Sequence, residues 1–191
     1  METNAYAEPG RLTALTTEQR ELVTSLGLDT IDLCRVAQGL LVAPLDAFGV
    51  GLSEQRMAER NLRPATVLLQ RALQLDSTVA LDRPRPAADR VVGTCRHFAV
   101  LATAFLRAVG VPARARCGFA TYFLPPRKVD HWIVEHWSSE DRRWIRVDPE
   151  YLDRSTPGGA RSHDLLPAEF LSAGEAWQRV RSGGDDAESY G

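Results

Sequence analysis

The chain has 191 residues, of which 44% are hydrophobic and 25% are charged, and its formal net charge is −2 at pH 7. This length suits one domain with a sizeable core. The small net charge gives no electrostatic reason to expect nucleic acid or an acidic membrane as a partner. Residues 1–10 contain neither a basic region nor an apolar run, and no segment approaches membrane length. We therefore expect a cytoplasmic protein.

The first 80 residues have the apolar spacing of helices and carry no recognisable chemistry. Threonine, serine and proline residues in this part can start helices. Four helices are expected, beginning near Thr17, Thr30, Ser53 and Pro64, and the second is expected to run to Pro44. After a flexible N-terminus at 1–12, residues 13–80 should form a helical layer over the rest of the fold.

Residues 81–89 contain two prolines among charged residues and predict an extended, exposed segment. This segment leads directly into Gly93 and Thr94. One interpretation is a loop that faces the substrate.

Residues 96–109 predict a buried helix whose first turn contains Cys95. Gly93 and Thr94 provide a sharp turn and a cap, and Gly110 ends the helix. The unpaired N–H groups and the macrodipole of a helix N-terminus favour the thiolate, which is the form of cysteine that attacks carbonyl groups. Cys95 is therefore a candidate nucleophile.

Strands are expected after this helix. Residues 113–119 alternate with the period of a strand whose buried face carries Ala113, Ala115, Cys117 and Phe119. Segments 131–137 and 143–148 are rich in strand-forming residues, and the polar run 138–142 between them reads as a hairpin turn.

The register of this hairpin decides whether a base and an acid meet. Directly opposed residues of an antiparallel pair have numbers with a constant sum. If the turn centres on Ser139 and Glu140, that sum is 279, and His131 faces Asp148 directly. We therefore expect Cys95, His131 and Asp148 to come together as nucleophile, general base and orienting acid. The backbone N–H of Cys95 would be one oxyanion donor.

Four separated blocks of this sequence resemble the transglutaminase-like superfamily. They are Gly93–Cys95, Ala99–Arg114, Asp130–Glu135 and Trp144–Pro149. The resemblance implies an α+β, papain-like core, in which a helix with the nucleophile packs on an antiparallel sheet with the base and acid. It also implies acyl transfer or hydrolysis on amides or thioesters, with a protein, a peptide or a small molecule as acyl donor. It leaves open whether the chain is a protease, amidase, crosslinking enzyme, amide synthase or inactive relative.

The chain departs from this pattern in two respects. No Gln or Asn precedes Cys95 closely, so the second oxyanion donor is unassigned. No acidic run has the spacing of a calcium loop, and paired ligands such as Cys-x-x-Cys are absent. We therefore expect no metal and no cofactor, although zinc ligation by Cys95, His97, His131 and Asp148 is a minor alternative.

The remaining cysteines and histidines have structural interpretations. Cys34 and Cys117 are expected to be buried as small apolar residues. His97 lies about 200° around the helix from Cys95 and should make local hydrogen bonds. His136 has the opposite strand parity to His131 and should face away from it. Surface charge is the simplest interpretation of Arg114 and Arg116.

The C-terminal part predicts one more helix, from about Pro167 to Arg181, and a flexible tail at 183–191. The whole span 13–182 is expected to be one domain, with the catalytic core at 90–150. Two function classes remain: a cysteine acyltransferase or hydrolase, and a non-catalytic binding or scaffold protein that keeps the same fold. The sequence does not predict an oligomeric state.

Overall fold

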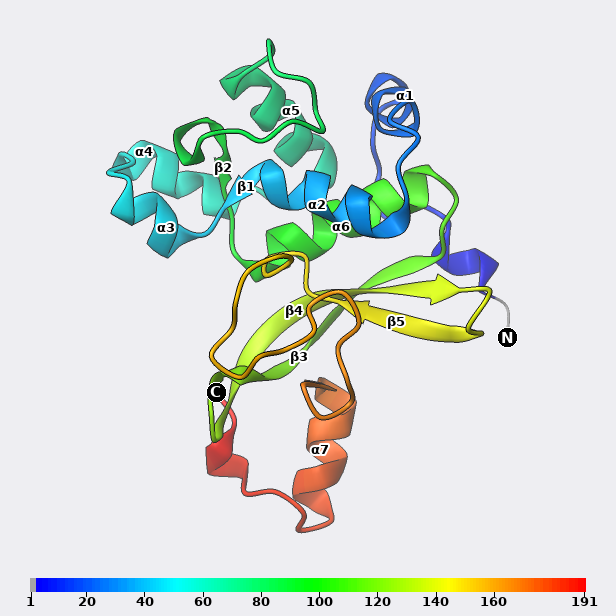
Figure 1. The fold of residues 1–191 in the computed structure, drawn as a ribbon, viewed down its shortest axis with the longest axis vertical. Coiled ribbons are helices and arrows are strands. Elements are labelled where there is room, and N and C mark those ends of the chain that lie inside the picture. The colour runs from blue at the N-terminus through cyan, green and yellow to red at the C-terminus, as the bar shows by residue number, and fades with distance from the viewer. Residues whose placement is uncertain (1–2) are drawn as a thin grey trace.

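The computed structural model describes residues 3–191, and it shows an α+β fold of helices and a mainly antiparallel sheet. Helices α1 to α5 gather on one side of the molecule, and the long helix α6 lies between them and the sheet (Figure 1). Helix α7 and the C-terminus lie beyond the sheet, on the side away from this helical layer. The expected arrangement of a helical layer, a buried helix that begins at Cys95 and an antiparallel sheet is confirmed.

The helical layer contains the four expected helices and one more. Its members are α1 (Thr17–Thr24), α2 (Thr30–Gly39), α3 (Pro44–Gly49), α4 (Glu54–Met57) and α5 (Ala65–Leu75). The prediction that the second helix runs to Pro44 was wrong. Residues 41 and 42 instead form strand β1 (Leu41–Val42), which pairs in parallel with β2 (Val91–Val92), and Pro44 starts α3.

Helix α6 (Cys95–Ala108) starts directly after β2 and is buried along most of its length. Its apolar side chains Leu101 and Phe105 are fully covered, because the helical layer packs on one side and the sheet on the other. Gly110 ends the helix at a φ of 80°, a backbone conformation that favours glycine. The predicted start and stop of this helix are confirmed.

The main sheet has the strand order β5-β4-β3-β6. Its strands are β3 (Ala113–Leu124), β4 (Arg127–Ser138), β5 (Arg143–Val147) and β6 (Phe170–Ser172). The prediction of a helix from Pro167 was wrong at its start, because Phe170 and Leu171 are buried in β6 beside β3. Helix α7 (Ala173–Arg181) begins only after Ser172, whose side chain caps it.

The hairpin of β4 and β5 has a different register from the one predicted. Val134 pairs with Val147 and Trp137 with Trp144, so the paired numbers sum to 281 instead of 279. The turn has four residues, and one of them, Arg142, has a positive φ of 54°. A shift of two residues keeps every side chain on its predicted face. Asp148 therefore leaves the end of β5 on the face that includes His131.

Ala113 of β3 is buried as predicted, but from Cys117 onward the buried face is the opposite of the predicted one. Gly118, Ala120 and Tyr122 are buried, whereas Cys117 is exposed. The expectation that Cys117 belongs to the core was wrong. Arg114 and Arg116 do not lie free on the surface, because both form ion pairs with Glu135, which is 2% exposed. The ion pairs with Glu135 therefore hold Arg114 and Arg116 of β3 on a face that is partly covered.

The segment 81–89 is exposed at most positions, as predicted, but Arg85 is buried. Its guanidinium donates hydrogen bonds to the backbone oxygens of Ala72, Asp76 and Val79. Arg85 therefore fixes this segment to the end of α5.

Both terminal segments contact the sheet. The ring of Tyr6 packs edge-on against Trp144, and the ring of Tyr190 packs edge-on against Phe119. Residues 1 and 2 of the expected flexible N-terminus lie outside the described residues, and the flexibility of 3–12 and 183–191 stays a prediction. None of the helices in the described chain, 3–191, is long and apolar enough to cross a membrane.

Candidate active site

The turn before α6 is held by Gly93, Thr94 and His97. Thr94 occupies the N-cap position, and its backbone N–H donates to Nδ1 of His97 over 3.0 Å. The other ring nitrogen of His97 lies 2.8 Å from the backbone oxygen of Leu62. A Cβ atom on residue 93 would stand 2.8 Å from Cβ of His97, so only glycine fits there. His97 is a local hydrogen-bonding residue, as predicted.

Cys95 is the first residue of α6 and is partly exposed. Within residues 3–191, neither its backbone N–H nor that of Arg96 has a hydrogen-bond acceptor. Free N–H groups at a helix N-terminus favour negative charge next to the thiol. The start of α6 therefore presents a sulfur and free backbone donors together.

His131 joins Cys95 to Asp148. Its Nε2 lies 3.0 Å from Oδ2 of Asp148, and both side chains are buried. A ring nitrogen of His131 also lies within 4.8 Å of Sγ of Cys95. Because Nε2 is engaged by Asp148, Nδ1 is the nitrogen left for the thiol. The structure thus brings together the three residues that the sequence selected, from a helix start, a strand and the end of a strand.

The carboxylate of Asp148 is fully hydrogen-bonded. Oδ2 accepts from the hydroxyl of Tyr122 over 2.5 Å as well as contacting His131, and Oδ1 accepts from the backbone N–H groups of Glu150 and Tyr151. These donors fix the carboxylate in position behind His131. Tyr122 was not predicted as part of the site. Its position in an alternating strand gave no signal of this role.

Asp148 and Cys95 together outweigh the effect of burial on the pKa of His131. Burial by itself lowers the pKa of His131, but the charge and hydrogen bond of Asp148 and the neighbouring Cys95 raise it, to about 10. His131 therefore holds a proton firmly next to the sulfur. The imidazolium form supplies the positive charge that a neighbouring thiolate needs.

Glu150 is a second residue that the sequence analysis missed. One of its carboxylate oxygens lies within 4.8 Å of both Sγ of Cys95 and a ring nitrogen of His131. Its side chain is buried, and burial raises its pKa to about 7. Asp148-Pro149 was recognised as a block, but the direction of the chain after Pro149 is set by tertiary contacts.

Gln38 of α2 fixes this part of the chain. Its amide Nε2 donates to the backbone oxygens of Glu150 and Leu152, over 3.0 and 2.8 Å. Helix α2 therefore holds the loop that follows β5 against the helical layer. The helical layer contributes in this way to the site, beyond covering α6.

His136 lies apart from the site. It has the opposite strand parity to His131 in β4, as predicted, and it is 6% exposed. Neither of its ring nitrogens has a hydrogen-bond partner within residues 3–191. Burial lowers its pKa, so the neutral form is favoured.

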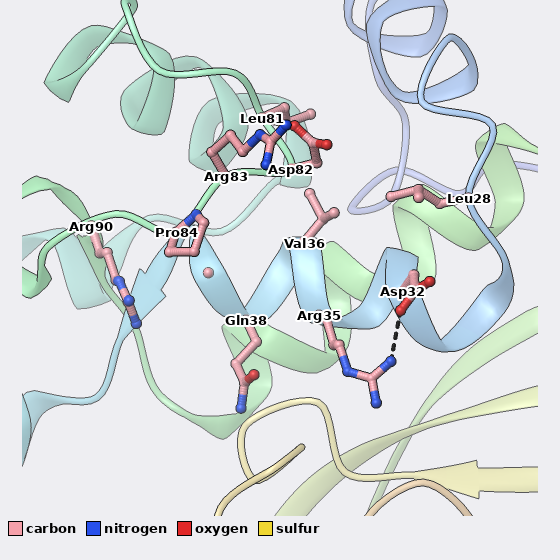
Figure 2. A pocket seen from close by; sticks show the side chains of 11 residues that line it. Leu28, Asp32, Arg35, Val36, Gln38, Leu81, Asp82, Arg83, Pro84 and Arg90 are labelled. Carbon is pink, nitrogen blue, oxygen red and sulfur yellow. Dashed lines mark hydrogen bonds and ion pairs between the residues drawn. The ribbon is translucent and has the colours of Figure 1, made fainter.

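A pocket of about 500 Å³ borders the site. Glu150, Phe98 and Arg90 are among the residues that line it. A second pocket, of about 380 Å³, lies along α2 and shares Gln38 and Arg90 with the first. Figure 2 shows Arg83 and Pro84 of the 81–89 segment on one side of this second pocket, and Arg35 ion-paired with Asp32 on the other. The 81–89 segment therefore lines a pocket that adjoins the one beside the site.

Comparison with known protein families gives one match, in the core of the chain. Residues 70–149 match the family described as the transglutaminase-like superfamily. The matched segment begins in α5, ends at Pro149 and contains Cys95, His131 and Asp148, whereas Glu150 lies one residue beyond it.

One solved structure supports the fold. A candidate cysteine protease from Cytophaga hutchinsonii aligns over 88% of this chain and 44% of its own length, with a TM-score of 0.52 and 16% identity. The periplasmic domain of TgpA from Pseudomonas aeruginosa also aligns, over 65% of this chain and 48% of its own, with a TM-score of 0.28 and 24% identity. The chain thus spans less than half the length of either structure. The search of curated proteins gives no match.

Proposed function

We propose that the protein is a cysteine acyltransferase or hydrolase that acts on an amide or a thioester through an acyl-enzyme. Cys95 would be the nucleophile, His131 the general base and acid, and Asp148 the residue that orients His131. The observation that supports this most directly is the position of His131. One ring nitrogen is held by Asp148 at 3.0 Å, and the ring also reaches the sulfur at the start of α6.

The proposed first step forms a thioester. With its proton already held on His131, the thiolate sulfur of Cys95 attacks the carbonyl carbon of the acyl donor. Negative charge collects on the carbonyl oxygen, where the N–H of Cys95 donates to it; losing one such donor typically costs about 3 kcal/mol of transition-state stabilisation. His131 then returns the proton to the leaving amine or thiol as the tetrahedral intermediate collapses.

The second step releases the acyl group. His131 takes a proton from water or from an acceptor amine, which attacks the thioester carbon, and the sulfur leaves and is reprotonated. Water gives hydrolysis, whereas an amine gives transfer. The pocket lined by Glu150 is the proposed place of the acyl donor, because Glu150 lies within 4.8 Å of Cys95 and His131.

The alternative of a non-catalytic binding protein predicts an unreactive thiol. The decisive test is alkylation by iodoacetamide of a Cys117→Ser variant, in which the exposed Cys117 is absent and Cys34 is fully buried. We expect Cys95 to react rapidly near pH 6 and to stop reacting in Cys95→Ser. A slow reaction that accelerates only above pH 8 would instead support the binding protein.

A mass measurement tests the acyl-enzyme itself. Cys117→Ser protein incubated with cell extract and quenched in acid should carry an adduct on the Cys95 peptide, and the adduct mass identifies the acyl group. Absence of any adduct, together with a slow thiol, would remove the enzymatic proposal. The cytoplasmic location expected from the sequence stays a prediction.

A further inference from the structure

Glu150 has a feature that the proposed acyl chemistry does not use. Its side chain is 8% exposed, and within residues 3–191 no donor makes a hydrogen bond to its carboxylate. The backbone of Glu150 is fixed on both sides, since its N–H donates to Oδ1 of Asp148 over 3.1 Å and its oxygen accepts from Gln38. The fold therefore holds an unpaired carboxylate beside Cys95 and His131.

An unpaired buried carboxylate is costly unless a cation or a proton joins it. His131 and Arg154 are the positive groups that act on Glu150. Arg154 is already paired with Asp46 over 3.1 Å. Within residues 3–191, no positive side chain therefore makes an ion pair with Glu150.

The three neighbouring groups are the ligand types that zinc prefers. Sγ of Cys95, a ring nitrogen of His131 and an oxygen of Glu150 all lie within 4.8 Å of one another. Zinc sites that keep an open position commonly have three protein ligands of the sulfur, nitrogen and oxygen types. Tetrahedral bonds of ordinary length separate such ligand atoms by about 3.3–3.6 Å. Rotation of the Cys95 and Glu150 side chains that moves their ligand atoms by about 1 Å closes the difference.

We propose that Cys95, His131 and Glu150 form a three-ligand site for a zinc ion, and that zinc bound there blocks the thiol. Glu150 also lines a pocket of about 500 Å³, which offers a cation an approach from the Glu150 side. Asp148 supports this site from behind. Its carboxylate holds Nε2 of His131, as carboxylates hold metal-binding histidines in many proteins, and Nδ1 is left for the metal.

The binding step balances without a redox partner. The thiol loses its proton to solvent and forms the sulfur–zinc bond, and His131 loses the proton on Nδ1 and binds through that nitrogen, while Nε2–H stays with Asp148. A sulfur bonded to zinc cannot attack a carbonyl carbon. Zinc and acyl donor therefore exclude each other. This inhibitory consequence rests on the proposed function, whereas zinc binding itself does not.

The structure changes the set of zinc ligands that the sequence offered. His97 is occupied in capping α6, with hydrogen bonds at both ring nitrogens. Asp148 has both oxygens engaged, by His131 and Tyr122 on one and by two backbone N–H groups on the other. Glu150 takes their place. The sequence-based expectation of no metal rested on the absence of closely spaced ligands, and these three come from distant parts of the chain.

The test measures zinc binding directly on reduced Cys117→Ser protein, by calorimetry with zinc chloride. We expect one zinc ion per chain, an affinity about tenfold or more weaker in Glu150→Gln, and loss of the site in Cys95→Ser. Glu140→Gln is the matched control, because Glu140 is exposed in the turn between β4 and β5 and should bind zinc like the parent protein. Stoichiometric zinc should also protect Cys95 from iodoacetamide, and a chelator should restore the reaction.

Several results would overturn the proposal. Equal affinity in Glu150→Gln and the parent would show that Glu150 is no ligand, and a site that survives Cys95→Ser would lie elsewhere. If Glu150→Gln does not fold, Glu150→Asp keeps the carboxylate and should bind zinc with intermediate affinity; unchanged affinity there contradicts the proposal. A thiol that is reactive without zinc, in protein that binds no zinc, removes this inference and leaves the proposed function intact.

Discussion

Two buried glutamates at opposite ends of the β4–β5 hairpin have opposite surroundings. Glu135 in β4 is clamped by Arg114, Arg116 and Arg146 at 2.7, 3.0 and 3.2 Å. Burial by itself raises its pKa, but the arginines lower it below the ordinary value. Glu150, beyond the end of β5, has no such partner, and burial raises its pKa to about 7.

The two glutamates have different roles: Glu135 stabilises the sheet, whereas Glu150 lies among groups that can react. At Glu135 three arginines neutralise one carboxylate, so the cluster holds β3, β4 and β5 together through their side chains. At Glu150 the fold leaves a carboxylate, a thiol and an imidazole close together, and the pKa values of the carboxylate and the imidazole are raised. Groups of this kind gather at functional sites, where local stability is given up for chemistry.

The largest expected effect concerns the end of the hairpin beside Glu150, where Cys95 and His131 lie. In Cys117→Ser protein near pH 6, His131→Ala should slow alkylation of Cys95 by about 10²- to 10⁴-fold, because the thiolate loses its base and its counter-charge. The loss should shrink as the pH rises, since hydroxide then ionises the thiol. The rate of iodoacetamide incorporation, followed by mass spectrometry, measures this. His163→Ala, which changes an exposed histidine, is the control, and equal slowing there would contradict a special role for His131.

The next effect concerns the other end of the hairpin, where Glu135 forms ion pairs with three arginines. Glu135→Gln should lower the free energy of unfolding by about 3–5 kcal/mol at pH 7, because it leaves three arginines without their common partner. The folded pKa of Glu135 is lowered, so its stabilisation is fully present above pH 4.5 and is lost as the pH falls through the folded pKa. The difference from the parent protein in urea unfolding should therefore shrink in acid. An unchanged midpoint at pH 7 would mean that the cluster adds no stability.

Glu150→Gln should have the opposite sign. The folded pKa of Glu150 is raised to about 7 from 4.5, so the residue lowers stability increasingly as the pH rises from 4.5 to 7. Removing the charge should raise the free energy of unfolding by about 3 kcal/mol at pH 8 relative to the effect at pH 4. Urea unfolding at both pH values with EDTA present measures this. A variant that is equally destabilised at both would show that the pKa of Glu150 is not raised in the folded protein.

The smallest effect concerns the support of Asp148. Tyr122→Phe keeps the ring packing but removes the hydroxyl that donates to Oδ2. A hydrogen bond to a charged group contributes about 1.5–3 kcal/mol, and three other contacts to Asp148 remain. Alkylation of Cys95 should fall by less than about tenfold, well short of His131→Ala. A loss as large as that of His131→Ala would mean that the hydroxyl, rather than the backbone donors, holds the acid in place.

The sequence predicted the local elements of the site well. The helix from Cys95, its stop at Gly110 and the hairpin between 138 and 143 follow from capping, left-handed glycine and strand propensity, which act within a few residues. The prediction that His131 and Asp148 share a face held despite an error of two residues in the register, because strand faces alternate with a period of two. A shift of one residue would have separated them.

Other features could not be predicted because they depend on distant residues. The alternation in β3 was correct, but its buried face was assigned by hydrophobicity, which does not anticipate that Glu135 draws Arg114 and Arg116 inward. Phe170 and Leu171 fit a helix or a strand equally well until the edge of β3 offers them hydrogen bonds.

By itself, the sequence determined the residue types of the site and the short-range geometry around each, since these depend on backbone conformation near Gly93, His131 and Pro149. Only the tertiary structure decided that Glu150 would be buried next to Cys95 without a partner. Helix α2, through Gln38, sets the course of the chain after β5, and the charge environment of a carboxylate depends on everything packed around it.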